Sequence, residues 1–241
     1  MTADKKINIR RFVIIFLLLC MLHFFFWLLP KSPLNTVLDS ATKSLPILWL
    51  LWGVCKSSQR TGLVIAALIF SFLGDMAAEI TALGSYAFLS QIGFFAIAQL
   101  CYLLSFQKYF SLRRKSGELS DRLAVICFFV VFAGYMAMTI LSGMVAKDTS
   151  MPISIAVIIY FGLISFMAIS AIGQRRKHYM YFVAGAMLFV FSDSIIAMHA
   201  FVSPVPGRGW WVMTTYYAAQ FLLNLAIIKE EDGDLKLVAA N

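Results

Sequence analysis

Uninterrupted apolar runs of about twenty residues recur along almost the whole chain, and they restrict its fold more than any other feature. A helix of roughly 20 apolar residues is long enough to cross a bilayer core about 30 Å thick. Of the 241 residues, 61% are hydrophobic and 13% are charged, whereas a soluble domain has about 25% charged residues. A water-soluble surface cannot be built from this composition. We therefore expect a polytopic membrane protein.

The apolar runs predict an all-α bundle of eight transmembrane helices in a single domain that covers residues 1–241. The second run is the weakest of the eight, because it carries Asp39, Lys43 and Pro46. The first run is too long for the core of a signal peptide, so we interpret it as a span. The predicted spans are 12–29, 37–54, 61–80, 86–106, 123–143, 153–172, 181–202 and 210–228.

The distribution of basic residues predicts the orientation of the bundle. If the N-terminus is cytoplasmic, sixteen Lys and Arg residues lie in the inner segments and three lie in the outer ones, namely Lys31, Lys147 and Arg208. Such a bias is typical of cytoplasmic loops, so we expect both termini in the cytoplasm. The net charge of +8 then reflects membrane topology and does not indicate a nucleic-acid partner. The short loops favour a bacterial inner-membrane protein.

Two pairs of spans share a pattern that indicates an internal repeat. The third and seventh spans contain Gly74-Asp75 and Ser192-Asp193, and the helix after each contains Ala98-Gln99 and Ala219-Gln220. Both members of each pair run in the same direction across the membrane. The pattern is consistent with a parallel duplication of four plus four helices about an axis along the membrane normal.

Asp75 and Asp193 are the strongest candidates for catalytic residues. They lie about 8 Å and about 14 Å from the outer ends of their spans, taking a rise of about 1.5 Å per residue. Charged side chains at such depth usually face the bundle interior and mark function. Burial disfavours the anion and two nearby carboxylates repel each other. We therefore expect one protonated and one ionised aspartate, an arrangement suited to general acid–base chemistry.

Other polar side chains on the same helical faces or near the same depth are candidates for substrate binding. The simpler alternative is hydrogen bonding between helices for Gln99, Tyr102, Tyr216 and Gln220. For Glu79 it is solvation at the interface. We interpret His23 and His199 as packing residues. The candidates are Lys43, Glu79, Gln99, Tyr102, Arg208, Tyr216, Tyr217 and Gln220.

The cysteines and histidines do not indicate a metal site or a cofactor. The 4 cysteines contain no CxxC pair, and the 3 histidines show no HExxH spacing. We therefore expect chemistry that needs neither a metal nor a cofactor.

The chain resembles the lysoplasmalogenase (YhhN-like) family of eight-helix membrane proteins. The resemblance extends from about residue 43 to 228, and Lys43-Ser44-Leu45-Pro46 is similar to the Lys-Pro-Leu signal of that family. Gln99 and Ser44 depart from the family pattern, in which many members have His and Pro. The remaining matching stretches are 70–75, 98–102, 185–194 and 216–220.

This resemblance implies hydrolysis of the vinyl ether bond of lysoplasmalogens, with a lysophospholipid as substrate and without a cofactor. The products would be a fatty aldehyde and a glycerophospho-ethanolamine or -choline. We expect Asp75 and Asp193 to act as acid and base, in an order that the sequence does not decide. Lys43 would tune this pair or meet the phosphate, and Arg208 would attract the headgroup. The tyrosines and glutamines would position substrate and water.

A proton-coupled transporter is the main alternative, because such proteins also use carboxylates inside the membrane. The nearly apolar inner halves of the third and seventh spans favour an enzyme instead. An intramembrane aspartyl protease is disfavoured because Phe72-Leu73 precedes Gly74, so its Gly-x-Gly-Asp motif is absent. A structural scaffold would leave the buried acids unexplained. The sequence predicts neither the oligomeric state nor the headgroup preference.

Overall fold

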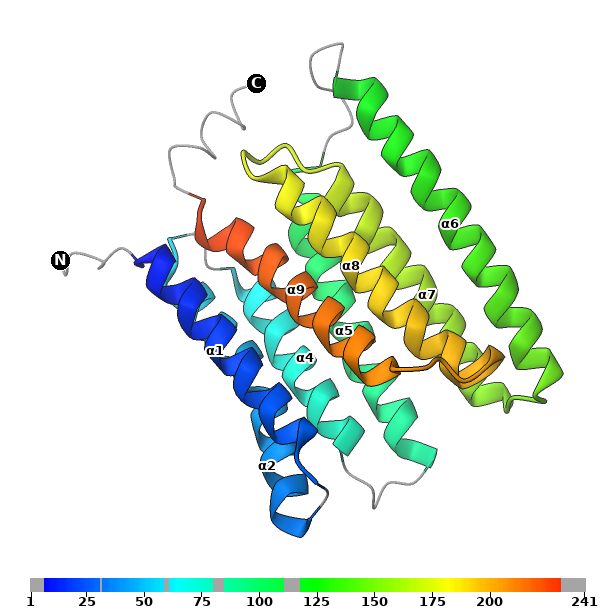
Figure 1. Cartoon of the computed structure of the whole chain (residues 1–241). Coiled ribbons are helices and arrows are strands. Elements are labelled where there is room, and N and C mark those ends of the chain that lie inside the picture. Colours follow the sequence, from blue (N-terminus) through cyan, green and yellow to red (C-terminus); the bar gives the residue numbers. More distant parts are fainter. Residues whose placement is uncertain (1–6, 31, 59–60, 80–84, 111–117, 231–241) are drawn as a thin grey trace.

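The structure, a computed structural model, describes residues 7–30, 32–58, 61–79, 85–110 and 118–230. Apart from an isolated bridge between Phe110 and Gln174, the regular elements in these ranges are helices, which confirms the predicted helical membrane bundle (Figure 1). They are α1 (Ile9–Leu28), α2 (Pro33–Lys43), α3 (Leu45–Lys56), α4 (Gly62–Glu79), α5 (Ser85–Gln107), α6 (Glu118–Ala146), α7 (Met151–Ile172), α8 (Tyr179–Ala197), the π-helix η2 (Met198–Val202) and α9 (Arg208–Ile228).

Seven helical segments in the described part of the chain are long and apolar enough to cross a bilayer. Backbone polar groups find no water in the lipid core, so an apolar run satisfies them internally by forming a helix. The seven segments correspond to all the predicted spans except the second. They are Ile9–Leu28, Gly62–Glu79, Tyr86–Gln107, Arg122–Ala146, Met151–Ile172, Tyr179–Val202 and Arg208–Ile228.

The predicted second span, 37–54, is not one helix, because α2 and α3 meet at Ser44. Pro46 explains the break, since its ring nitrogen cannot donate a hydrogen bond and its ring clashes with the carbonyl group four residues earlier. At the break the Tyr217 hydroxyl donates to the Lys43 carbonyl oxygen at 2.6 Å. The break therefore places Lys43 at the end of a short helix, with its backbone held by α9.

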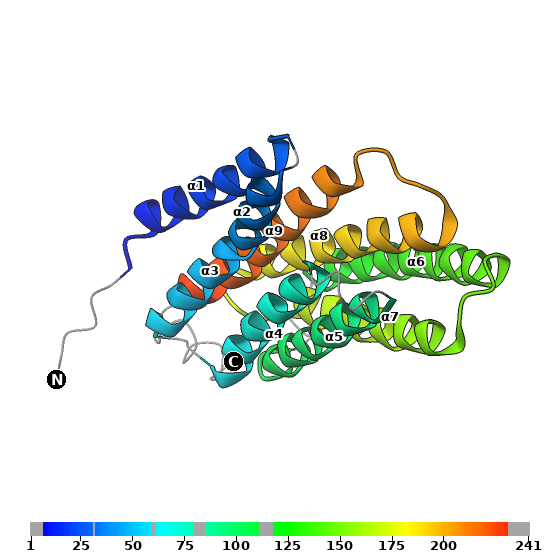
Figure 2. The ribbon, with the colours of Figure 1, turned by 90° about the horizontal axis from the view of Figure 1, so that it is seen from below.

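Six of the described helices form a closed ring in which each contacts the next: α3, α4, α5, α7, α8 and α9, with α9 returning to α3. The most extensive contacts are those of α4 with α5 and of α8 with α9. Outside the ring, α1 packs on α2 and α3, and α6 packs on α7 and η2. Figure 2 shows α1 and α6 on opposite flanks of the bundle.

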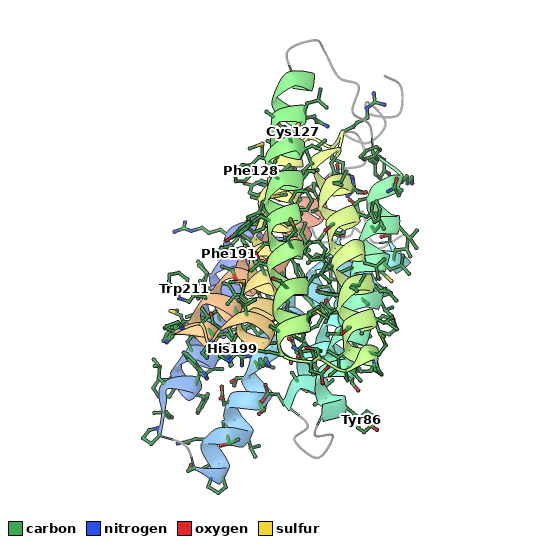
Figure 3. All side chains as sticks on the ribbon, turned by 90° about the vertical axis from the view of Figure 1, so that its right-hand side faces the viewer. Tyr86, Cys127, Phe128, Phe191, His199 and Trp211 are labelled. Atoms are coloured by element: carbon green, nitrogen blue, oxygen red, sulfur yellow. The ribbon has the colours of Figure 1, made fainter. Side chains whose placement is uncertain are left out.

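The surface of the bundle is apolar, as expected for contact with lipid. Phe128, Phe191 and Trp211 are exposed on its outer side, and Tyr86 is exposed at one end (Figure 3). That end also carries α2 and the turns 147–150 and 203–207 (Figure 1). We call it the α2 end, and the functional candidates gather near it.

Candidate active site

A cavity of about 560 Å³ lies at the α2 end, and both Asp75 and Asp193 line it. Asp75 comes from the last turns of α4, and Asp193 comes from α8, on the opposite side of the ring. The two carboxyl groups are close enough to interact electrostatically. Two acids that are 118 positions apart in the sequence thus line one cavity.

Asp75 is 3% exposed and accepts a hydrogen bond of 2.9 Å from the Tyr216 hydroxyl of α9. The Tyr216 ring is itself held edge-on between Phe95 and Phe189, at centroid distances of 5.8 and 5.6 Å. Such aromatic contacts restrict the orientation of a ring. The donor that orients the Asp75 carboxyl group is therefore fixed by packing on two sides.

Asp193 has an equivalent partner that the sequence analysis missed, the hydroxyl group of Tyr160 on α7, which donates to Asp193 Oδ2. Tyr160 stands in an almost wholly apolar run, which we interpreted as an ordinary span. The available signal was an isolated hydroxyl group near the depth of an acid on a neighbouring span. A linear pattern could not decide whether this hydroxyl group faces the interior or the lipid.

Charged side chains from three helices form the rim of the cavity. Lys43 Nζ lies 2.6 Å from Glu79 Oε1, and Ser40 donates to Glu79 Oε2 at 3.0 Å. On the α1 side, His23 Nδ1 lies 3.5 Å from Asp39 Oδ1. Lys43, Glu79, His23 and Asp39 all line the cavity. His23, which we interpreted as a packing residue, therefore also belongs to the cavity wall.

Arg208 also lines the cavity, at the start of α9. Glu79 and Lys43 have side chains that are 34% and 14% exposed, so the rim is more accessible than Asp75, which is 3% exposed. Lys43 pairs with Glu79, and it also acts electrostatically on Asp75. The cation predicted for this layer is present, but its direct partner is Glu79.

Three of the predicted binding residues, Tyr102, Gln220 and Tyr217, lie outside the cavity wall and make hydrogen bonds between helices. Tyr102 donates to Gln220 Oε1 at 2.8 Å, and Gln220 Nε2 donates to Ser71 Oγ at 3.0 Å. Asn224 extends this network by donating to the Tyr102 oxygen at 2.9 Å. Tyr217 anchors the break between α2 and α3. These contacts match the simpler alternative for the polar side chains.

Gln99 also lies outside the cavity wall, fully buried on α5. Its side-chain amide lies within hydrogen-bonding reach of the Tyr160 hydroxyl group. Gln99 thus lies next to Tyr160, the residue that donates a hydrogen bond to Asp193.

The chemistry of the cavity is that of carboxyl groups, hydroxyl groups and one ammonium–carboxylate pair. Within the described ranges, the His, Cys, Asp and Glu residues form no group of three or more that could hold a metal ion. The two acids have phenol donors and an aromatic wall formed by Phe88 and Phe95. Such a site can donate a proton, accept one and stabilise a nearby positive charge.

A family model described as the YhhN family matches residues 38–227. The chain belongs to the YhhN family. The matched segment includes Lys43, Asp75, Tyr160, Asp193 and Arg208, and it starts inside α2, so α1 with His23 lies outside it. The YhhN match therefore covers both acids and both of their tyrosine donors.

Curated relatives of this YhhN protein carry the name lysoplasmalogenase. Lysoplasmalogenase TMEM86B of Homo sapiens is 28% identical over 230 residues, which cover 94% of this chain and 91% of that protein. The Rattus norvegicus TMEM86B is 27% identical and covers 93% of this chain and 87% of its own length. Lysoplasmalogenase TMEM86A of Bos taurus is 25% identical, with 87% and 85% covered. No solved structure matches the chain significantly.

Proposed function

We propose that this protein is a membrane enzyme that hydrolyses the vinyl ether bond of lysoplasmalogens. The products are a fatty aldehyde and glycerophosphoethanolamine or glycerophosphocholine. The observation that carries the proposal is the placement of Asp75 and Asp193 in one cavity, each held by a tyrosine hydroxyl group. The names of the relatives, all lysoplasmalogenases, support the same activity.

The first step is protonation of the vinyl ether at its β-carbon by the carboxylic acid of the pair. The double-bond electrons form the new C–H bond and leave an oxocarbenium ion at the α-carbon and the ether oxygen. The ionised carboxylate stabilises this cation at short range. Proton transfer from a positioned group contributes typically 10²–10⁴-fold to the rate.

The second step is addition of water to the α-carbon while the carboxylate accepts a proton from it. The resulting hemiacetal then collapses by cleavage of the bond between the α-carbon and the ether oxygen. In the collapse the first acid, now ionised, takes the proton of the hemiacetal hydroxyl group, and the second acid protonates the departing alcohol. Both carboxyl groups return to their starting states, so the cycle needs no added proton and no cofactor.

The rim is suited to the polar end of a lysophospholipid. Lys43 and Arg208 offer cations for the phosphate group, and Glu79 holds Lys43 in place. A single-chain amphiphile that enters sideways from the bilayer brings its ether oxygen just below the headgroup. The acids lie just beneath the charged rim, at the depth that such a substrate requires.

The membrane arrangement that we propose has eight crossings, with α2 and α3 together forming the second. The bias of Lys and Arg residues then places both termini in the cytoplasm and the α2 end on the opposite side. We assign the protein to a bacterial inner membrane because its loops are short.

The ring supports the four-plus-four repeat. In the first half α4 contacts α3 and α5, and in the second half α8 contacts α7 and α9 in the same way.

The test is an assay of purified protein with an alkenyl lysophospholipid and with its saturated alkyl analogue. The alkenyl lipid should release aldehyde, and the alkyl ether should be inert because it has no double bond to protonate. Asp75→Asn and Asp193→Asn should each reduce turnover by at least about a hundredfold. Full aldehyde release by both single variants would overturn the mechanism, and absence of release by the wild type would overturn the activity.

A proton-coupled transporter is favoured by one observation, the buried chain of polar side chains that continues beyond the cavity through Ser71, Gln220, Tyr102 and Asn224. Such a chain is also what interhelical hydrogen bonding produces. Uptake of lysolipid by sealed vesicles without any aldehyde release would favour the transporter.

A further inference from the structure

A second cavity, of about 60 Å³, lies beside the first and differs from it in chemistry. Most of its wall is apolar and comes from α5, α7, α8 and η2. The two cavities share Phe88, Gln91, Phe95, Asp193 and Ile196. Among the described residues, Asp193 is the carboxyl group that lines both, whereas Asp75 lines the larger cavity alone.

The far wall of the small cavity belongs to a separate apolar core at the α2 end. This core contains Ile140 and Met144 of α6, Val157 of α7 and Phe201 of η2. Val157 and Phe201 also line the small cavity. In Figure 3, α6 stands in front, and His199 marks the position of η2 beside its end.

The π-helix explains how Phe201 reaches this place. A π-turn inserts an extra residue into a helix and shifts the side chains that follow it, and such turns are frequent at functional sites. The Phe201 carbonyl group is in turn pressed against Gly143 of α6, where a side chain would collide with it. α6 thus supports the π-helix, which closes the apolar cavity.

We propose that the small cavity is the subsite for the aliphatic chain of the substrate, with the carbons nearest the ether lying against Val157 and Phe201. The subsite rests on the proposed function, which supplies a single-chain ether lipid as the ligand. A lysophospholipid has one polar end and one apolar end. The two joined cavities match it, because the larger one has a charged rim and the small one has a mostly apolar wall. The charged groups of Lys43, Glu79 and Arg208 lie on the wall of the larger cavity, so the aliphatic chain favours the apolar side.

This orientation assigns different roles to the two acids. In a vinyl ether the β-carbon lies on the chain side and the α-carbon lies on the oxygen side. With the chain in the small cavity, the β-carbon faces Asp193, which therefore donates the proton. The α-carbon then lies toward Asp75, which accepts a proton from the attacking water. Asp75 is also the acid that lies near the Lys43 cation.

The volume of the cavity determines which probes can test the subsite. About 60 Å³ is twice the share of one water molecule in the liquid, about 30 Å³, so the cavity holds only the first carbons of the chain. The decisive comparison is therefore between a hexadecenyl substrate and an ethenyl substrate, which has no carbon beyond the double bond. Both carry the same phosphocholine headgroup.

The test uses Val157→Phe, which fills the cavity, and Ile158→Phe, its matched control on the lipid face of α7, where Ile158 is 53% exposed. Val157→Phe should raise KM for the hexadecenyl substrate by about tenfold or more and change kcat/KM for the ethenyl substrate by less than about twofold, because that substrate has no carbon to place in the small cavity. Ile158→Phe should change neither. Ile92→Phe, from α5, provides a second filled cavity if Val157→Phe does not give monodisperse protein.

A binding measurement separates failure of the subsite from failure of the proposed function. Hexadecyl lysophosphocholine, which has no vinyl group, should bind about tenfold more weakly to Val157→Phe than to Ile158→Phe. If this difference in binding is measured but the wild type does not hydrolyse the alkenyl lipid, the subsite is supported and the vinyl ether chemistry is rejected. If the wild type hydrolyses the alkenyl lipid but Val157→Phe and Ile158→Phe have equal effects, the subsite is rejected and the proposed function stands. The same conclusion follows if Val157→Phe affects the long and the short substrate equally.

Discussion

At the scale of single residues, each aspartate has its own tyrosine donor from a neighbouring helix. Tyr216 donates to Asp75 and Tyr160 donates to Asp193, in both cases to Oδ2. In the mechanism that we propose, the second oxygen of each carboxyl group exchanges protons with substrate or water. Aromatic packing fixes Tyr216, and α7 carries Tyr160. The two acids are therefore oriented independently of each other.

Tyr160→Phe should lower kcat because Asp193 loses the donor that orients it. In the proposed proton transfer Asp193 becomes a carboxylate, and a hydrogen bond to a charged group contributes about 1.5–3 kcal/mol, so the expected decrease in kcat is about 10- to 100-fold. KM should change by less than about twofold. Steady-state kinetics with an alkenyl lysophospholipid measure both values. Tyr135→Phe is the control, because Tyr135 is 64% exposed on α6; equal kinetics for the two variants would contradict the role of Tyr160.

At the scale of the helices, close approach between α8 and α9 brings Asp193 near Tyr216, the tyrosine that donates to Asp75. A Cβ atom at Gly185 would lie 2.8 Å from Leu223 Cγ and 3.0 Å from the Ala219 carbonyl oxygen. Small residues at such positions let membrane helices approach closely. α9 carries Tyr216, while α8 carries Asp193, so the spacing of this pair determines the shape of the cavity between them.

Gly185→Val should push α9 away from α8 and reduce both stability and activity. Overpacking of this kind costs typically about 1–3 kcal/mol, and we expect a lower melting temperature in detergent together with a loss of aldehyde release. Gly162→Val on α7 makes the same chemical change where no atom lies within 4 Å, so it should leave both properties nearly unchanged. An unchanged melting temperature for Gly185→Val would show that the contact is not tight.

At the scale of the whole molecule, the two ends of the bundle contain different polar features. The α2 end holds the cavity, and the opposite end holds a buried ion pair of 3.5 Å between Arg176 and Glu230. Arg176 also lies over the rings of Tyr109 and Phe182. Burial lowers the pKa of the Arg176 guanidinium group from its ordinary value, and the Glu230 carboxylate opposes that shift. This pair joins the end of α9 to the segment between α7 and α8.

Glu230→Gln should destabilise the protein without changing its chemistry. Removing one partner of a buried pair leaves an uncompensated charge and costs about 3–5 kcal/mol. The melting temperature in detergent should fall by several degrees, while kcat and KM at low temperature should remain within about twofold. A selective loss of kcat in a protein of unchanged melting temperature would show that the two ends are coupled in catalysis.

Much of the site could be anticipated because transfer to lipid makes polar residues conspicuous. Asp75, Asp193, Lys43, Glu79, Tyr216 and Arg208 stand out in an apolar background, and all six line the same cavity. Tyr160 could not be found in this way, since its function depends on the direction in which α7 faces. Tyr102 and Gln220 are as conspicuous as Tyr216, yet they lie outside the cavity wall.

The sequence by itself determined that the chain forms apolar helices, because an unpaired peptide group is too costly in lipid for any other local structure. It also determined that Asp75 and Asp193 lie within spans, since their depth follows from their position in the apolar runs, whereas the buried Glu230 was not predicted. Only the tertiary structure decided which helices are neighbours in the ring. That choice depends on side-chain packing between segments far apart in the chain, and it alone placed Tyr160 on Asp193 and an apolar cavity behind it.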